Sequence, residues 1–240
     1  MVSANPKDVI ILAGGLGTRL KGLIPEHYPK VMTLIAGKPF LEILLRKIAS
    51  QKIARVILAL GFGSDAVIDY AQYLSKKIGV EILISIEPRP LGTAGALKYA
   101  LPLIQTDPFI VMNGDTFSDV NLDRLLNNHL LKKADATIGL VHILNPDRFG
   151  IVEVDKDTGR VIRFSEKSSQ AKSALISAGT YVFSKSLLNL IPSDTFYSLE
   201  LAIFPRLVGK NFYGFDCCTK LIDIGTPESL QASNNYFGKL

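Results

Sequence analysis

The chain has 240 residues, which suits one large domain with a substantial core and is short for two independent domains. With 48% hydrophobic and 20% charged residues, the composition is that of a globular protein and excludes the disordered and low-complexity classes. The net charge of +5 arises from residues scattered along the chain, without the basic stripe of a nucleic-acid binder, and this mild excess of cations suits small phosphorylated substrates.

In the first half of the chain, apolar segments of strand length alternate with segments of helical period. This alternation is typical of βαβ units, in which helices cover both faces of a parallel sheet. We therefore predict an α/β fold with a doubly wound, mostly parallel, Rossmann-like sheet in a single domain over residues 1–240. The predicted strands are residues 9–13, 56–60, 80–86 and 109–112, and the predicted helices are residues 40–48, 65–76 and 93–104.

The pattern loosens in the second half of the chain. A helix at residues 122–133 and a strand at 136–143 are followed by two alternating segments whose connecting turn predicts an inserted β-hairpin. The two hairpin segments are residues 151–154 and 161–164. The remaining predicted elements are a strand at 178–183, short helices at 186–190 and 198–207, a strand at 220–224 and a helix that begins at 227.

The chain carries no sequence feature of a membrane or secreted protein. No apolar run approaches the roughly 20 residues of a membrane helix, and residues 9–13 are too few for a signal-peptide core. Cys217 and Cys218 are sequence neighbours, which suits reduced packing residues better than a long-loop disulfide. We therefore expect a cytoplasmic protein without a membrane or nucleic-acid partner.

A glycine-rich loop follows the first strand directly. Gly14, Gly15 and Gly17 stand where the chain must turn, so that main-chain N–H groups can approach an anion closely. The spacing is neither that of a dinucleotide-binding loop nor that of a P-loop. Arg19 offers permanently charged donors to phosphate oxygens, and Lys30 brings a second cation. The glycines alone allow a ligand-free turn, and the two cations favour a phosphate-binding loop.

Two aspartates are candidate metal ligands. Asp115 follows Asn113 and the fourth strand, at the sheet edge where open α/β sheets bind ligands. Asp223 lies in an otherwise apolar strand, where a carboxylate is costly unless it is paired or binds a cation. Thr226, just before a proline, already suits the helix-capping role that would be the other interpretation of Asp223.

These motifs together resemble the sugar-phosphate nucleotidylyltransferase family. The glycine loop ending at Arg19, Pro29-Lys30, and the segments around Asp115 and Asp223 carry the resemblance. It implies that Arg19 and Lys30 are catalytic cations at the α-phosphorus, and that Asp115 and Asp223 bind Mg²⁺. The family usually has a second proline after the lysine; this chain has Val31, which predicts a less rigid loop. The implied nucleotide-binding residues are Leu12, Ala13, Gly14, Gly15, Gly17, Thr18, Arg19, Glu87, Gly92 and Thr93.

The resemblance also divides the chain between its two substrates. It implies that residues 1–120 mainly bind the nucleotide and residues 121–240 mainly bind the sugar phosphate. The residue at the position of Glu87 often meets the edge of the base; an ionised Glu87 can only accept hydrogen bonds, which suits the N1–H and amino groups of guanine and favours GTP. The hairpin region would bind the sugar. The implied sugar-phosphate residues are Asn113, Gly150, Glu166, Lys167 and Gly179.

The activity implied by the resemblance is transfer of a nucleoside monophosphate from a triphosphate to a sugar 1-phosphate, with release of pyrophosphate. The size, the glycine loop and Pro90-Leu91-Gly92-Thr93 resemble those of bacterial D-glycero-D-manno-heptose 1-phosphate guanylyltransferases of surface-polysaccharide synthesis. Mannose-1-phosphate guanylyltransferase, glucose-1-phosphate thymidylyltransferase and N-acetylmuramate-1-phosphate uridylyltransferase remain alternatives. From other classes, a non-catalytic nucleotide-sugar sensor would tend to lack the loop arginine, the loop lysine or a metal carboxylate, all of which are present here. A dinucleotide-binding oxidoreductase would require the dinucleotide spacing that the loop lacks. The sequence leaves the oligomeric state open, a homo-oligomer included.

Overall fold

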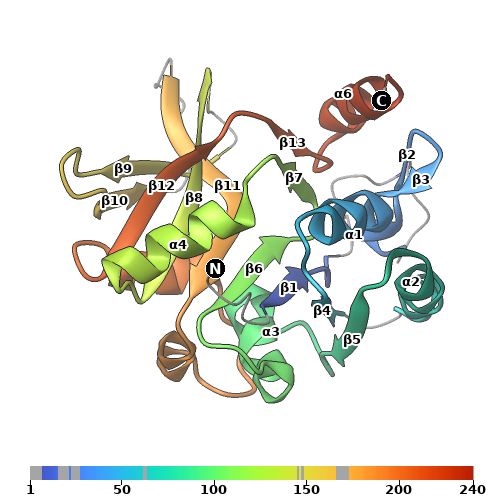
Figure 1. Ribbon diagram of the computed structural model, residues 1–240, viewed down its shortest axis with the longest axis horizontal. Coiled ribbons are helices and arrows are strands. Elements are labelled where there is room, and N and C mark those ends of the chain that lie inside the picture. Colours follow the sequence, from blue (N-terminus) through green and yellow to red (C-terminus); the bar gives the residue numbers. More distant parts are fainter. Residues whose placement is uncertain are drawn as a thin grey trace.

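The computed structural model of the protein describes residues 7–15, 22, 28–61, 64–144, 146, 149–165 and 173–239. Within this part of the chain, a nine-stranded sheet runs through the centre in the order β10-β9-β11-β6-β1-β4-β5, with β8 beside β11 and β12 beside β8 (Figure 1). No helix in the described ranges is long and apolar enough to cross a membrane.

The first half of the chain forms the parallel part of the sheet. Strand β1 lies between β4 and β6, and β5 pairs with β4, all in parallel register. The predicted doubly wound α/β arrangement is confirmed here. The strands are β1 (Asp8–Leu12), β4 (Arg55–Leu60), β5 (Glu81–Ile86) and β6 (Phe109–Asn113), and the helices are α1 (Phe40–Ser50), α2 (Asp65–Ile78) and α3 (Gly92–Ala100), which continues into the 3-10 turn η3 (Leu101–Leu103).

Two apolar cores lie on opposite faces of this sheet because successive strand residues point to opposite sides. Val9 and Ile11 belong to the core that contains buried residues of α1 and α2. Ile10, between them in sequence, belongs to the core that contains the buried residues of α3. The four parallel strands are thus apolar on both faces, which explains the nearly continuous apolar runs in the sequence.

The second half of the chain makes the sheet mixed. Strand β11 is antiparallel to β6, β8 and β9, and only β12 and β8 pair in parallel there. The predicted hairpin is confirmed as β9 and β10. The elements are α4 (Leu122–Lys132), β8 (Ala136–Leu144), β9 (Ile151–Val154), β10 (Val161–Ser165), β11 (Ser173–Phe183), the 3-10 helix η4 (Lys185–Leu190), the π-helix η5 (Leu199–Ile203), α5 (Phe204–Leu207), β12 (Phe212–Cys218), β13 (Leu221–Asp223) and α6 (Pro227–Phe237).

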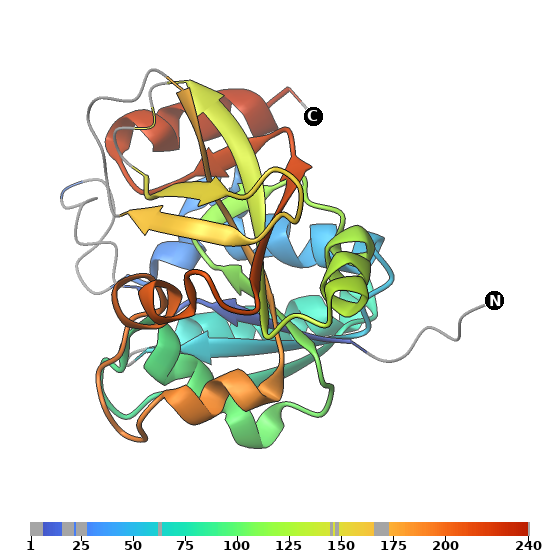
Figure 2. The same cartoon turned by 90° about the vertical axis from the view of Figure 1, so that its left-hand side faces the viewer.

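Several short elements escape sequence prediction. They are the 3-10 turn η2 (Lys30–Met32), the two-residue strands β2 (Leu34–Ile35) and β3 (Lys38–Pro39), and β7 (Thr116–Ser118); the longer β12 was missed as well. In both views of the molecule, α6 lies at the end away from η4 (Figure 1 and Figure 2). Cys217 and Cys218 are free thiols, in agreement with the sequence prediction.

Candidate active site

A cavity of about 430 Å³ opens at the carboxyl ends of the parallel strands. We call it the glycine cavity because Gly14 and Gly15 form part of its wall. The predicted nucleotide residues that the structure describes all line it, as does Lys30; these residues are Leu12, Ala13, Gly14, Gly15, Glu87, Gly92 and Thr93. The other predicted members of the loop, Gly17, Thr18 and Arg19, lie outside the described residues.

A second cavity of about 270 Å³ adjoins the first. We call it the hairpin cavity because Gly150, before β9, and Phe164, on β10, line it. Gly179 and Asp223 also line it, whereas the predicted sugar-phosphate residues Glu166 and Lys167 lie outside the described residues. The two cavities share the four residues Lys30, Asn113, Asp115 and Glu200.

Gly14 brings the main chain of the loop against a carboxylate. A Cβ atom at this position would lie 2.9 Å from Glu87 Oε1 and 3.2 Å from Gly61 N. Both distances are shorter than ordinary van der Waals contacts, so only glycine fits without a shift of its neighbours. The close approach therefore places the loop backbone and the Glu87 carboxylate on one continuous wall of the glycine cavity.

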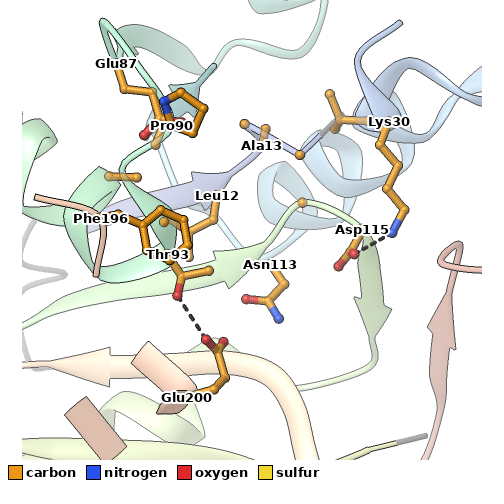
Figure 3. Close-up of a pocket in the computed structure, with 17 residues that line it drawn as sticks. Leu12, Ala13, Lys30, Glu87, Pro90, Thr93, Asn113, Asp115, Phe196 and Glu200 are labelled. Atoms are coloured by element: carbon orange, nitrogen blue, oxygen red, sulfur yellow. Dashed lines mark hydrogen bonds and ion pairs between the residues drawn. The ribbon is translucent and has the colours of Figure 1, made fainter. Parts of the chain in front are cut away.

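Lys30 is held in place by its own main chain. Its N–H donates to Gly15 O at 3.2 Å, and the 3-10 turn η2 begins at this residue. The side chain is buried, and Nζ donates to Asp115 Oδ2 at 2.6 Å (Figure 3). The hydrogen bond and the turn fix the lysine without the second proline of the family pattern. The Lys30 side chain, paired with Asp115, therefore lies on the boundary between the two cavities.

The two predicted metal ligands are brought together by the ladder of β7 and β13. In this antiparallel pair, Thr116 lies opposite Asp223, and Ile224 N donates to Asp115 O at 3.0 Å. Asp223 Oδ1 accepts hydrogen bonds from Gly225 N at 2.8 Å and from Ser229 Oγ at 3.0 Å. Asp223 therefore also stabilises the turn before α6, while Thr226 caps that helix as predicted.

The donor set on the shared boundary fits a hard divalent cation. Asp115 and Asp223 both line the hairpin cavity, and in the described ranges no group of three or more His, Cys, Asp or Glu forms a complete metal cage. Asn113 Oδ1, from the same wall, is buried and accepts no hydrogen bond from a described residue. Mg²⁺ characteristically uses one or two carboxylates and completes its shell with phosphate oxygens and water. The residues present therefore fit Mg²⁺ bound together with substrate phosphates.

Glu87 is buried in the wall of the glycine cavity. Its Oε2 accepts a hydrogen bond from Leu91 N at 3.0 Å, and Oε1 faces Gly14. Burial raises the pKa of this carboxyl above its ordinary value, although the hydrogen bond from Leu91 opposes the shift. A largely desolvated acceptor of this kind is costly unless a ligand donates to it, which suits a base-recognising group.

Among the residues that line the glycine cavity but were not predicted from the sequence are Phe196 and Glu200. Glu200 Oε2 accepts a hydrogen bond from Thr93 Oγ1 at 2.9 Å (Figure 3). It also accepts one from Ser198 Oγ at 2.8 Å. It lies in the π-helix η5, a rare element that often occurs at functional sites. A carboxylate within the apolar segment Leu199–Ile203 was the available signal, the same one that drew attention to Asp223.

The floor of the hairpin cavity comes from β11. Gly179 has a φ of +66°, a conformation that side chains rarely adopt, and an added Cβ would lie 3.3 Å from Asn113 Nδ2. Ser177 Oγ donates to the Tyr181 hydroxyl at 3.1 Å, and burial raises the pKa of Tyr181. The cavity thus presents hydroxyl and amide groups beside a strand that bends close to Asn113, which suits a polyhydroxylated ligand.

Comparison with known proteins identifies relatives over nearly the whole chain. Residues 8–238 match the nucleotidyl transferase family. The D-glycero-alpha-D-manno-heptose 1-phosphate guanylyltransferase of Aneurinibacillus thermoaerophilus is 34% identical over 222 residues, 92% of this chain and 94% of that protein. The enzyme of the same name from Campylobacter jejuni is 36% identical over 224 residues, 92% and 96% of the two chains.

Two further proteins are also similar to this chain. The mannose-1-phosphate guanylyltransferase of Mycobacterium tuberculosis is 36% identical over 230 residues, which are 95% of this chain but only 63% of that protein. The crystal structure of HddC from Yersinia pseudotuberculosis complexed with GMP-PN superimposes with a TM-score of 0.84 at 35% identity, and covers 96% of this chain and 99% of that one.

Proposed function

Because the chain belongs to the nucleotidyl transferase family, we propose that it transfers GMP from GTP to D-glycero-D-manno-heptose 1-phosphate and releases pyrophosphate. The observation that carries the proposal is the pair of adjoining cavities with four residues in common. Two substrates bound in these cavities would meet at Lys30, Asn113, Asp115 and Glu200. A displacement reaction between two phosphorylated substrates needs this juxtaposition.

The relatives support heptose over mannose as the sugar. The two heptose 1-phosphate guanylyltransferases match this chain over almost their full length, whereas the chain spans under two thirds of the mycobacterial mannose-1-phosphate enzyme. Mannose 1-phosphate remains the second candidate because the identity to that enzyme is equally high. We place the reaction in the cytoplasm, where nucleoside triphosphates are available, and its product would supply surface-polysaccharide synthesis.

The proposed reaction is an in-line attack by a sugar-phosphate oxygen on the α-phosphorus of GTP. The nucleophile is already an anion, so the protein needs no general base, and catalysis reduces to positioning and charge stabilisation. Lys30, buried on the boundary of the two cavities, is positioned to offset charge on both phosphates. Arg19, from the glycine loop, would hold the pyrophosphate end.

Asp115 and Asp223 are the residues that would hold Mg²⁺. The bound cation would supply neutralisation of phosphate charge near the α-phosphorus. In the ligand-free protein, the Lys30 ammonium pairs with Asp115 Oδ2. When the substrates bind, Lys30 would therefore exchange this carboxylate for phosphate oxygens. This exchange would require only the flexible side chain of Lys30 to move.

Recognition of guanine is assigned to Glu87. Its carboxylate lies on the wall of the glycine cavity, and an ionised carboxylate accepts from both the N1–H and the amino group of guanine. On the sugar side, the amide of Asn113, the space beside Gly150 and Gly179, and the side chains of Glu166 and Lys167 would bind the hydroxyl and phosphate groups.

A panel of substrates tests this proposal. Purified protein with Mg²⁺ is offered GTP, dTTP, UTP or ATP together with heptose, mannose or glucose 1-phosphate, and pyrophosphate release is measured. We expect the highest kcat/KM for GTP with D-glycero-D-manno-heptose 1-phosphate. A preference for dTTP or UTP would refute the role of Glu87, and nucleotide-sugar binding without turnover of any pair would identify the protein as a sensor.

A further inference from the structure

Phe196 is a large aromatic side chain that is 65% exposed at the wall of the glycine cavity. Among the described residues that line this cavity it is the only aromatic one. It does not line the hairpin cavity, which has its own aromatic residues, Phe149, Phe164 and Tyr181. Phe196 therefore belongs to the nucleotide side of the proposed two-substrate site.

The main chain around Phe196 is fixed against the start of α3. Tyr197 N donates to Leu91 O at 2.8 Å, and Tyr197 O accepts from Ala94 N at 2.9 Å and from Gly95 N at 3.2 Å. Arg89 Nη2 adds a hydrogen bond of 2.6 Å to Asp194 O. The Phe196 ring is thus carried by an anchored segment, although the ring itself remains exposed.

The position of the ring places it on the base-binding side of the cavity. Its Cε2 would lie 3.3 Å from a Cβ added at Gly92, next to the loop that begins at Glu87. In Figure 3, Phe196 and Pro90 lie on one side of the cavity, whereas Lys30 and Asp115 lie on the other. The phosphate-binding groups and the aromatic ring therefore occupy opposite sides.

The ring has no partner of its own in the described part of the chain. No aromatic ring or cation there is paired with Phe196, whereas exposed Tyr73 on α2 packs on Tyr70, with ring centroids 6.1 Å apart, and lies beneath Lys77. An anchored aromatic ring that faces a cavity without a partner is arranged to stack on a flat ligand.

From these observations we propose that Phe196 is the stacking platform for the base of the nucleoside triphosphate. This inference rests on the proposed function. In it, Phe196 contributes affinity for the nucleotide, and Glu87 determines which base is bound. Every base has a π-face, so stacking alone discriminates weakly among them. The larger purine ring covers more of the platform, so GTP and ATP stack better than dTTP and UTP.

A single introduced tryptophan tests the inference directly. The chain has no Trp, so Phe196→Trp places the only indole fluorophore at the cavity wall. We expect GTP to quench this fluorescence with a dissociation constant close to the KM of the wild-type protein for GTP. Inorganic tripolyphosphate, which occupies phosphate sites without a base, leaves the fluorescence unchanged. Tyr73→Trp, on α2 and 53% exposed, is the matched control and stays unquenched at the same GTP concentrations.

Kinetic constants give a second readout. Phe196→Leu keeps an apolar side chain and removes the ring, so KM for GTP rises about tenfold or more, whereas Phe196→Tyr stays within about threefold of the wild type. KM for the sugar phosphate changes in neither variant. Absent quenching, equal quenching by tripolyphosphate, or an unchanged GTP KM in Phe196→Leu would each overturn the inference. Failure of the wild-type protein to release pyrophosphate with any substrate pair would overturn the proposed function instead, while the fluorescence titration still reports nucleotide binding.

Discussion

The glycine cavity takes most of its wall from the ends of parallel strands and the segments that directly follow them, whereas the hairpin cavity is lined by strands and loops far apart in the sequence. Leu12 to Gly15 and the segment from Glu87 to Ala96 supply most of the first wall. The second wall combines Lys30 with residues spread from Asn113 to Gly225. One site is therefore made chiefly by local chain geometry and the other by long-range strand pairing.

This difference predicts how each cavity responds to mutation. At Gly14 of the glycine cavity, an added Cβ would strike the buried Glu87 carboxylate and the Gly61 main chain, so these neighbours must shift. In the hairpin cavity, most of the lining residues contribute side chains, so their exchange alters the shape of the site while the backbone is kept. We expect the shared boundary to be least tolerant, because both substrates depend on it.

The largest effect is expected for the carboxylates of the boundary. Asp115→Asn or Asp223→Asn lowers kcat about a thousandfold, because charge stabilisation by a bound metal ion is worth several kcal/mol. Pyrophosphate release measures the rate, and circular dichroism checks the fold. Asp157→Asn, at an exposed turn, is the control and retains full activity. Residual activity above one tenth in either boundary variant would contradict the assignment of a metal site.

The second-largest loss of kcat is expected for Lys30→Met. Loss of a preorganised cation at developing charge lowers kcat about a hundredfold, whereas Lys76→Met, on the exposed face of α2, has no effect. Because Lys30 lies between the cavities, both GTP and the sugar phosphate lose affinity. Steady-state kinetics with each substrate varied in turn measures this, and a change confined to one KM would place Lys30 in one cavity only.

Gly14→Ala separates the two cavities. The added methyl group displaces Glu87 and the loop, so KM for GTP rises about fiftyfold while KM for the sugar phosphate stays constant. Gly15→Ala, where a Cβ would meet nothing within 4 Å, is a stability control: its melting temperature stays at the wild-type value, whereas that of Gly14→Ala falls. Equal increases in both KM values for Gly14→Ala would remove the distinction between the cavities.

Gly179→Ala is the reciprocal test. Its φ of +66° strains any side chain by about 1–2 kcal/mol, and the methyl group would press on Asn113. We expect KM for the sugar phosphate to rise about tenfold with little change in KM for GTP. The same two-substrate kinetics measure both constants. An effect on GTP binding as large as that of Gly14→Ala would show that the two cavities act as one.

The smallest effect on catalysis is expected for Glu87, the residue proposed to recognise the nucleotide base. Glu87→Gln replaces an acceptor by a group that also donates, so kcat/KM for GTP falls about tenfold and the preference over other triphosphates shrinks. Burial raises the pKa of Glu87, so in the free protein this carboxyl gains a proton at a higher pH than an exposed glutamate does. As the pH falls, KM for GTP therefore rises in the wild type and stays flat in Glu87→Gln; parallel profiles would contradict the role of Glu87.

Local patterns made the parallel half of the fold predictable. Continuous apolar runs marked β1, β4 and β6, because both faces of these strands are buried, and a similar run marked the partly buried edge strand β5. Strand β12 was missed because Gly214 and Asp216 have poor strand propensity, and only pairing with β8 makes the segment a strand. The antiparallel course of β11 depends on its neighbours and leaves no trace in its own sequence.

The candidate site also contains residues that local sequence predicts and residues that only long-range contacts bring together. Leu12 to Gly15, which form one part of the wall of the glycine cavity, follow one another in the chain, so a contiguous motif predicted them. Glu200 carried a usable signal, a carboxylate in an apolar segment, whereas Phe196 looked like any exposed aromatic residue until the structure placed it at the cavity. The pairing of Thr116 with Asp223, which joins the two aspartates, is a long-range contact that periodicity cannot reveal.

The most direct test of the two-substrate site is the dependence of pyrophosphate release on both substrates together. Protein with Mg²⁺ is given GTP alone, D-glycero-D-manno-heptose 1-phosphate alone, and the two combined, and the products are quantified. Our account predicts pyrophosphate only in the combined reaction, with one nucleotide sugar formed for each pyrophosphate. Pyrophosphate release from GTP alone at the same rate, or no nucleotide sugar from the combined reaction or from any other sugar 1-phosphate, would contradict it.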